Sequence, residues 1–210
     1  MCKRTLEPLP TPEWKKQEPT SIYAITKKDQ EDMCLLIGKT YGIKTTALRY
    51  FNVFGPRQSL SNPYTGVVAI FLSRLKNGNP PIIFEDGKQC RDFISVYDVV
   101  EANILAMKKE AANYEVFNVG TGKKFSVLKI ANELIKLTNS KIKPIITGKY
   151  RKGDIRHCFA DVRKIESKLG FRAKIEFPQC LRDILNWSTN VRAIDKSEKA
   201  LKELKEKGLA

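Results

Sequence analysis

Several features that would assign the 210-residue sequence to a simple class are missing. No run approaches the roughly 18 apolar residues of a transmembrane helix, and residues 1–4 lead into prolines and charges rather than the apolar core of a signal peptide. We therefore expect a cytoplasmic protein. The five cysteines, at positions 2, 34, 90, 158 and 180, are too few and too widely spaced for a disulfide framework or a local zinc site, so free, mostly buried thiols are expected.

Internal repeats and a glycine-rich dinucleotide fingerprint are also missing. The stretch Asn118–Gly122 holds two glycines, but their spacing is wrong for that fingerprint, so we expect a structural turn. The only histidine, His157, lies in a predicted loop, where a packing or surface role is favoured over catalysis.

A hydrophobic content of 42% suits a globular core, and the formal net charge is +15. Such a charge attracts polyanions. The lysines are dispersed among acidic residues, however, and lack the clustering with aromatic residues that is typical of nucleic-acid interfaces. We therefore expect a solvated lysine-rich surface, no nucleic-acid partner and no membrane. A basic nucleic-acid-binding domain is the alternative.

Hydrophobic periodicity predicts an α/β chain. Thr20 or Ser21 can cap a helix that ends near Gly42 and carries an apolar stripe, and a strand over 45–50 follows. Helix, turn and strand make one half of a parallel α/β unit. After irregular residues 1–19, strands are also expected over 82–84, 116–119 and near 145. Helices are expected over 67–76, 96–109, 126–138 and 162–169, from Pro178 onward, and as a solvated surface helix over 193–207.

Five short motifs follow one another along the chain: Tyr23-Ala-Ile-Thr-Lys27, Arg49-Tyr-Phe-Asn-Val-Phe-Gly-Pro56, Arg91-Asp-Phe-Ile94, Asn118–Gly122 and Arg151-Lys-Gly-Asp154. In this order they resemble the extended short-chain dehydrogenase/reductase family of NAD-dependent sugar-nucleotide epimerases and dehydratases. The resemblance covers roughly residues 5–190. It implies that residues 1–56 are the C-terminal remainder of a Rossmann domain with a parallel sheet. Residues 57–190 would form a small α/β substrate-binding domain, with some strands returning to the Rossmann sheet, and 191–210 a charged C-terminal helix.

The family's glycine-rich phosphate turn, its acidic ribose-binding residue and the Ser/Thr partner of its tyrosine have no counterpart in this sequence. We therefore expect an N-terminally shortened enzyme that binds NAD poorly and is inactive alone. Exposed apolar surface would make it weakly stable or self-associating. A partner could supply the missing N-terminal half, and the full-length family implies a homodimer.

Tyr23 and Lys27 are the candidate catalytic pair. Four residues apart, they share one face of a helix. A free phenol is a poor base at neutral pH, and a nearby ammonium stabilises the phenolate. The family resemblance implies that both residues also bind NAD. The same spacing occurs by chance in many helices, so only the motif order gives it weight.

The resemblance implies further roles. Tyr50 would bind the cofactor, and the candidate substrate-binding residues are Asn52, Val67, Ile82, Phe84, Arg91, Arg151 and Asp154. Arginine suits phosphate because it donates bidentate hydrogen bonds. We expect Arg91, Arg151, Asn52 and Asp154 to lie in loops and to converge on one cleft. A surface ion pair between Arg91 and Asp92 is the alternative reading.

The implied reaction is C4 epimerisation of a dTDP- or UDP-sugar through a 4-keto intermediate, with NAD as cofactor. The stretch Gln58–Val67 resembles a subgroup that acts on deoxysugar nucleotides such as dTDP-L-rhamnose. A 4,6-dehydratase is the nearest alternative. A non-catalytic fragment that binds nucleotide sugars is another.

Overall fold

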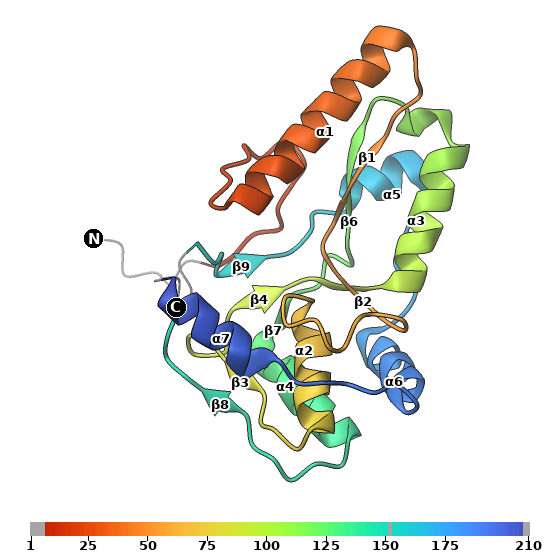
Figure 1. Ribbon diagram of the computed structural model, residues 1–210. Coiled ribbons are helices and arrows are strands. Elements are labelled where there is room, and N and C mark those ends of the chain that lie inside the picture. The colour runs from red at the N-terminus through yellow and green to blue at the C-terminus, as the bar shows by residue number, and fades with distance from the viewer. Residues whose placement is uncertain (1–6, 151–152, 208–210) are drawn as a thin grey trace.

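The computed structural model describes residues 7–150 and 153–207 and shows a mixed α/β chain (Figure 1). Both parallel and antiparallel strand pairs occur, so the expected fold class is confirmed. In chain order the elements are α1 (Ile22–Tyr41), β1 (Ala47–Tyr50), β2 (Asn52–Phe54), α2 (Val67–Lys76), β3 (Ile82–Ile83), β4 (Cys90–Arg91), β5 (Phe93–Ser95), α3 (Val96–Lys108), the 3₁₀ turn Glu110–Ala112, β6 (Val116–Val119), β7 (Phe125–Ser126), α4 (Val127–Leu137), β8 (Ile145–Ile146), β9 (His157–Cys158), α5 (Arg163–Leu169), α6 (Phe177–Ser188) and α7 (Ser197–Glu206).

Parallel strands form the part of the fold that carries α1. β1 pairs in parallel with β6, and β2 pairs in parallel with β5. Neighbouring residues of a strand point to opposite faces. Accordingly, Arg49 binds Glu31 of α1, whereas Tyr50 binds Asn103 of α3. α1 and α3 therefore cover opposite faces of β1 (Figure 1).

Two hydrophobic clusters hold the chain together. The first lies under α3 and α5 and includes the fully buried Phe117 and Leu169. The second lies among α2, α4 and α6, where Phe177 contacts the rings of Phe54, Phe93 and Phe125. Phe54 at the end of β2 belongs to the second cluster, while Leu48 of β1 packs against the first. The step from β1 to β2 thus carries the chain from one cluster to the other.

The turn after β6 is fixed by the buried carboxylate of Asp92. It accepts hydrogen bonds from the backbone N–H groups of Thr121, Gly122 and Ala160 and from the Thr121 hydroxyl. A Cβ at Gly120 would lie 2.6 Å from this carboxylate, so glycine is required there. The glycines of this motif are therefore structural, as expected. The alternative ion pair between Arg91 and Asp92 is wrong, because these donors occupy Asp92.

The ends of α1 match the sequence prediction. The Ser21 hydroxyl accepts from the Ala24 N–H, and Gly42 closes the helix in the left-handed conformation with φ 67°. The helices over 67–76, 96–109 and 126–138 are confirmed to within a residue or two. The short strands over 90–95 were missed because two- and three-residue strands carry no usable periodicity.

Three other expectations need correction. Of the four cysteines in the described ranges, only Cys180 is buried, where burial raises its pKa to about 12; Cys34 is exposed. α6 begins at Phe177, one residue before the expected proline. The C-terminal helix exists, but Ala200 is buried and the side chain of Asp195 just before the helix is only 7% exposed, so this segment is more than a solvated helix.

The expected apolar stripe on α1 is present but uncovered. The side chains of this stripe are 42–77% exposed: Ile22, Ile25, Met33, Leu36 and Ile37.

A second exposed apolar face lies on α3, formed by Tyr97, Val100, Ile104 and Met107. Between these helices β1 pairs only with β6, and the described residues provide no strand for its other edge. No helix in the described ranges is long and apolar enough to span a membrane.

Candidate functional site

A cavity of about 670 Å³ separates α1 from β1. Tyr23 and Lys27 of α1 and Tyr50 of β1 all line this α1–β1 cavity. Gln17, Glu18 and Pro19, which precede α1, form another wall. The structure therefore brings the three residues predicted to contact the cofactor to one cavity.

The two side chains of the candidate catalytic pair lie one helical turn apart. The Lys27 ammonium is 5.9 Å from the centroid of the Tyr23 ring and donates a 3.2 Å hydrogen bond to Gln30. Tyr23 is 72% exposed. Its hydroxyl makes no hydrogen bond to another described residue, so it is accessible to a ligand in the cavity.

Tyr50 borders the same cavity, but its hydroxyl is directed elsewhere. It donates a 2.9 Å hydrogen bond to Asn103 on α3, on the face of β1 opposite α1. This bond holds the Tyr50 phenol away from Lys27. In this conformation, Tyr50 can offer the cavity its backbone and the near side of its side chain rather than its hydroxyl.

The predicted substrate residues lie on several elements. Asn52 opens β2, where its backbone N–H donates to the Asp92 carbonyl. Val67 is the first residue of α2, and Ile82 lies on β3 with Phe84 just after it. Asn52 and Arg91 are on strands, so the expectation that both lie in loops is wrong.

Arg91 is held by main-chain carbonyls of the segment that follows residue 154. Its Nη1 donates to the carbonyls of Cys90 and Arg156, both at 2.9 Å, and its Nη2 donates to the carbonyl of Ile155. A guanidinium has five N–H donors. Nε–H and one N–H of Nη2 make no bond to any described residue. In a guanidinium, Nε–H and the adjacent N–H of Nη2 form the edge that binds phosphate bidentately.

The segment 153–156 links Arg91 to the start of α1. The Thr20 hydroxyl donates a 3.0 Å hydrogen bond to the Gly153 carbonyl. Asp154 is therefore in a segment that contacts Arg91 at one end and adjoins the helix of Tyr23 at the other. Arg151 lies outside the described residues. The convergence of all four predicted residues on one cleft stays a prediction.

Charged side chains fix the outer side of the same segment. Arg156 pairs with Glu85 and, at 2.8 Å, with Asp86. The guanidinium, together with the Lys88 N–H, lowers the pKa of the Asp86 carboxyl from 3.8 to about 2. Burial, reinforced by the positive charges of Arg156 and Arg91, lowers the pKa of His157. His157 is partly buried and lies on β9 rather than in the predicted loop.

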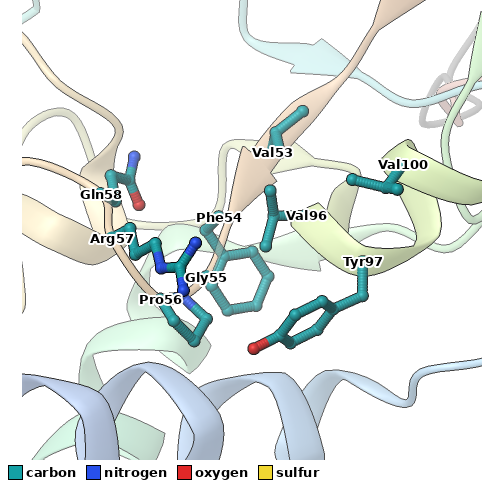
Figure 2. Close-up of a pocket in the computed structure, with 9 residues that line it drawn as sticks. All are labelled: Val53, Phe54, Gly55, Pro56, Arg57, Gln58, Val96, Tyr97 and Val100. Carbon is teal, nitrogen blue, oxygen red and sulfur yellow. The ribbon is translucent and has the colours of Figure 1, made fainter. Parts of the chain in front are cut away.

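A second cavity, of about 500 Å³, lies between the end of β2 and α3 (Figure 2). It is lined on the side of β2 by Val53 and Phe54 and on the side of α3 by Val96, Tyr97 and Val100. None of the predicted site residues in the described ranges lines it. Its wall is mostly apolar, with Arg57 and Gln58 as the polar members.

One contact that positions α1 lay unrecognised in the sequence. Glu31 accepts two hydrogen bonds from Arg49, at 2.8 and 2.7 Å, and one from Gln17 at 3.3 Å. Arg49 also donates to the Glu13 carbonyl. This network ties α1 to β1 and to the segment before α1. Glu31 shares a helix with Lys27, but an Arg–Glu pair between distant segments leaves no local signal in one sequence. No cluster of metal-ligating side chains occurs in the part of the chain that the structure describes.

Comparison with known proteins identifies the family of the chain. Residues 5–120 match the NAD dependent epimerase/dehydratase family. The chain is 36% identical to a putative UDP-glucose 4-epimerase of Methanocaldococcus jannaschii, covering 87% of this chain and 58% of that protein. It is 33% identical to a dTDP-L-rhamnose 4-epimerase of Burkholderia thailandensis, over 80% of this chain and 46% of that protein.

Among solved structures, a Thermotoga maritima UDP-glucose 4-epimerase with UDP-glucose superimposes with a TM-score of 0.79 and 39% identity, covering 87% of this chain and 58% of that chain. The chain thus spans about half to three-fifths of the length of these relatives. The match over residues 5–120 and the shared identity establish that the chain belongs to the NAD dependent epimerase/dehydratase family.

Proposed function

We propose that this chain carries the acid/base pair and the substrate-binding part of a sugar-nucleotide 4-epimerase. The observation that carries the proposal is the position of Tyr23 and Lys27 in the α1–β1 cavity. Support comes from the segment 153–156, which joins the start of α1 to Arg91. Residues 1–56 would belong to the cofactor domain and 57–190 to the substrate domain.

NAD is the cofactor of the family, and the described residues fit one end of it. The α1–β1 cavity offers an accessible phenol and an ammonium, the groups that suit a ribose and a reacting sugar hydroxyl. The sequence contains no glycine-rich turn before a helix to receive the pyrophosphate. We therefore assign Tyr23, Lys27 and Tyr50 to the nicotinamide end alone. When bound, NAD supplies reversible hydride transfer.

The residues of this chain would contribute proton transfer and orientation. Tyr23, as phenolate, accepts the proton of the C4 hydroxyl while the C4 carbon is oxidised to a ketone. The same phenol returns the proton after the sugar presents its other face and is reduced. Lys27 stabilises the phenolate electrostatically and holds hydroxyl groups.

The substrate would be a nucleoside diphosphate sugar. The open edge of the Arg91 guanidinium would bind the diphosphate, assisted by Arg151, and Asp154 would accept from ribose hydroxyls. Asn52 would donate to the diphosphate or the sugar. Ile82 and Phe84 would flank the base, with Val67 contributing backbone bonds. The similarity to a dTDP-L-rhamnose 4-epimerase and to UDP-glucose 4-epimerases supports a dTDP- or UDP-sugar.

The site also needs further polypeptide. We propose that a segment carrying a parallel strand pairs with the free edge of β1, a strand that lines the α1–β1 cavity. It would cover the apolar cavity beside α3 (Figure 2) and leave the cavity of Tyr23 accessible. The exposed stripe on the opposite side of α1 fits the homodimer implied by the family resemblance.

A chimaeric enzyme tests the proposed reaction. The part of the Thermotoga maritima epimerase that precedes its counterpart of α1 is joined to residues 20–207 of this chain. With NAD and dTDP-L-rhamnose or UDP-glucose, we expect a product of unchanged mass. The Tyr23→Phe chimaera should be slower by about 10²–10⁴-fold. A product lighter by one water would identify a dehydratase, and full activity of Tyr23→Phe would remove Tyr23 from the mechanism.

The alternative from another class is a nucleotide-sugar-binding protein without chemistry. The intact Arg91 region beside an incomplete cofactor site favours it. It predicts nucleotide-sugar binding by the chimaera with no turnover, so the same experiment separates the two.

A further inference from the structure

The C-terminal segment 193–206 is anchored to α2 by a buried ion pair. Asp195 accepts from Arg74 at 3.0 Å and from Asn79 at 2.8 Å. The side chains of Arg74 and Asp195 are only 3% and 7% exposed. Asn77 adds a 3.0 Å bond to the Ala193 carbonyl. All three partners of the segment lie at or just after the C-terminal end of α2, so the chain is fixed there before α7 begins.

After this anchor, α7 extends away from α2 (Figure 1), and the segment contacts the loop 57–66 that precedes α2 at two points. Asp195 also accepts from the Ser197 N–H at 2.9 Å and so caps the start of α7. Glu203, near the far end of α7, accepts a 2.9 Å hydrogen bond from Tyr64. That bond raises the pKa of Tyr64. A second bond, from the Ile194 N–H to the Ser61 hydroxyl, measures 2.9 Å.

The loop held in this way controls the start of α2. Leu60 is buried in the cluster below it, and Gln58 donates to Thr65 at 3.2 Å. Gly66 is the cap residue of α2 and offers no side-chain bond to the helix. Contacts of the loop therefore hold the turn that leads into Val67, alongside the core packing of Val68 and Ala69, and two of these contacts come from the C-terminal segment.

We infer that the segment 193–206 is a strap that positions the loop 57–66, and through it Val67, for a nucleotide sugar. The choice of a nucleotide sugar as ligand rests on the proposed function, whereas the contacts between the segment 193–206 and the loop do not depend on it. Tyr64 and Glu203 act through the loop and are positioning residues. Asp195 is the fixed end of the strap, and the Tyr64–Glu203 bond is the end that can be released.

The test removes the releasable end and leaves the buried anchor intact. Tyr64→Phe and Glu203→Ala each delete the hydrogen bond, whereas Glu203→Gln keeps an acceptor oxygen. Glu206→Ala, on the same helix, is the matched control because its only described ion pair is an exposed one with Lys202 at 3.9 Å. Two quantities are measured in the full chain: the rate of tryptic cleavage after Arg57, and the Kd for UDP-glucose by calorimetry.

We expect Tyr64→Phe and Glu203→Ala to raise both the cleavage rate and the Kd by about 3- to 10-fold, the range for one lost hydrogen bond. The double variant should be no worse than either single variant, and Glu203→Gln and Glu206→Ala should resemble the unchanged chain. Additive effects or an unchanged cleavage rate would overturn the strap. Faster cleavage with an unchanged Kd would refute the link to ligand binding. Failure of the unchanged chain to bind UDP-glucose would count against the proposed function, while cleavage would still decide the strap.

Discussion

Replacing Glu31 by Gln should loosen the helix that carries Tyr23 and Lys27. Gly38 is the one residue of α1 that is buried against the rest of the chain. The Arg49–Glu31 pair is therefore a large part of what holds α1 against β1. The Arg49 and Glu31 side chains are 25% and 13% exposed. Breaking an exposed pair costs about 0–1 kcal/mol and breaking a buried one about 3–5 kcal/mol. For this half-buried bidentate pair we expect the free energy of unfolding to fall by about 1–3 kcal/mol.

A neighbouring ion pair on the same helix provides the control. Lys28 and Asp32 are four residues apart, 2.5 Å between charged atoms, and 37% and 57% exposed. Asp32→Asn should therefore lower the free energy of unfolding much less than Glu31→Gln does. Urea unfolding followed by circular dichroism gives both values, provided the denaturant slopes agree. Equal losses for Glu31→Gln and Asp32→Asn would refute the view that the Arg49 pair anchors α1.

Three further predictions concern charge and surface. Because the sequence has one histidine, NMR of the untagged chain should show a single imidazole that titrates below 6.5. Because the pKa of His157 is lowered in the folded chain, the neutral imidazole adds to the free energy of unfolding above pH 6.5, and this contribution is lost as the pH falls below 6.5. An imidazole that titrates above pH 6.5 would contradict this packing. Asp86, with its pKa of about 2, should contribute stability above pH 3.8 that is lost between pH 3.8 and 2; Asp86→Asn should flatten the melting curve against pH there, and an unchanged slope would argue against the Arg156 bond. The uncovered faces of α1 and α3 should cause self-association at micromolar concentration, reduced by Leu36→Glu and Met107→Glu, whereas a monodisperse monomer with a high, sharp melting transition would show that these faces need no partner.

The sequence predicted the parts of the fold that depend on local signals. Ser21 and Gly42 define the ends of α1 because capping chemistry is local. The motif order placed Tyr23 and Lys27 correctly on one helix. Contacts between distant segments could not be predicted from the sequence. Local periodicity carries no sign of the hydrogen bonds that Asp92 accepts from the turn at 121–122. The same holds for the bonds between Glu31 and Arg49 and between Asp195 and Arg74. Each depends on the folded positions of segments far apart in sequence.

Direct titration of nucleotide sugars into the chain tests whether it binds them through Arg91. UDP-glucose and dTDP-L-rhamnose are each added to the unchanged protein, to Arg91→Ala and to Arg172→Ala, an exposed arginine 3.6 Å from Glu166. We predict that at least one of them binds. Arg91→Ala should weaken that binding by about 1.5–3 kcal/mol, the cost of losing charged hydrogen bonds, and Arg172→Ala should leave it unchanged. Absence of binding at millimolar concentration, or equal affinity of all three proteins, would contradict the account.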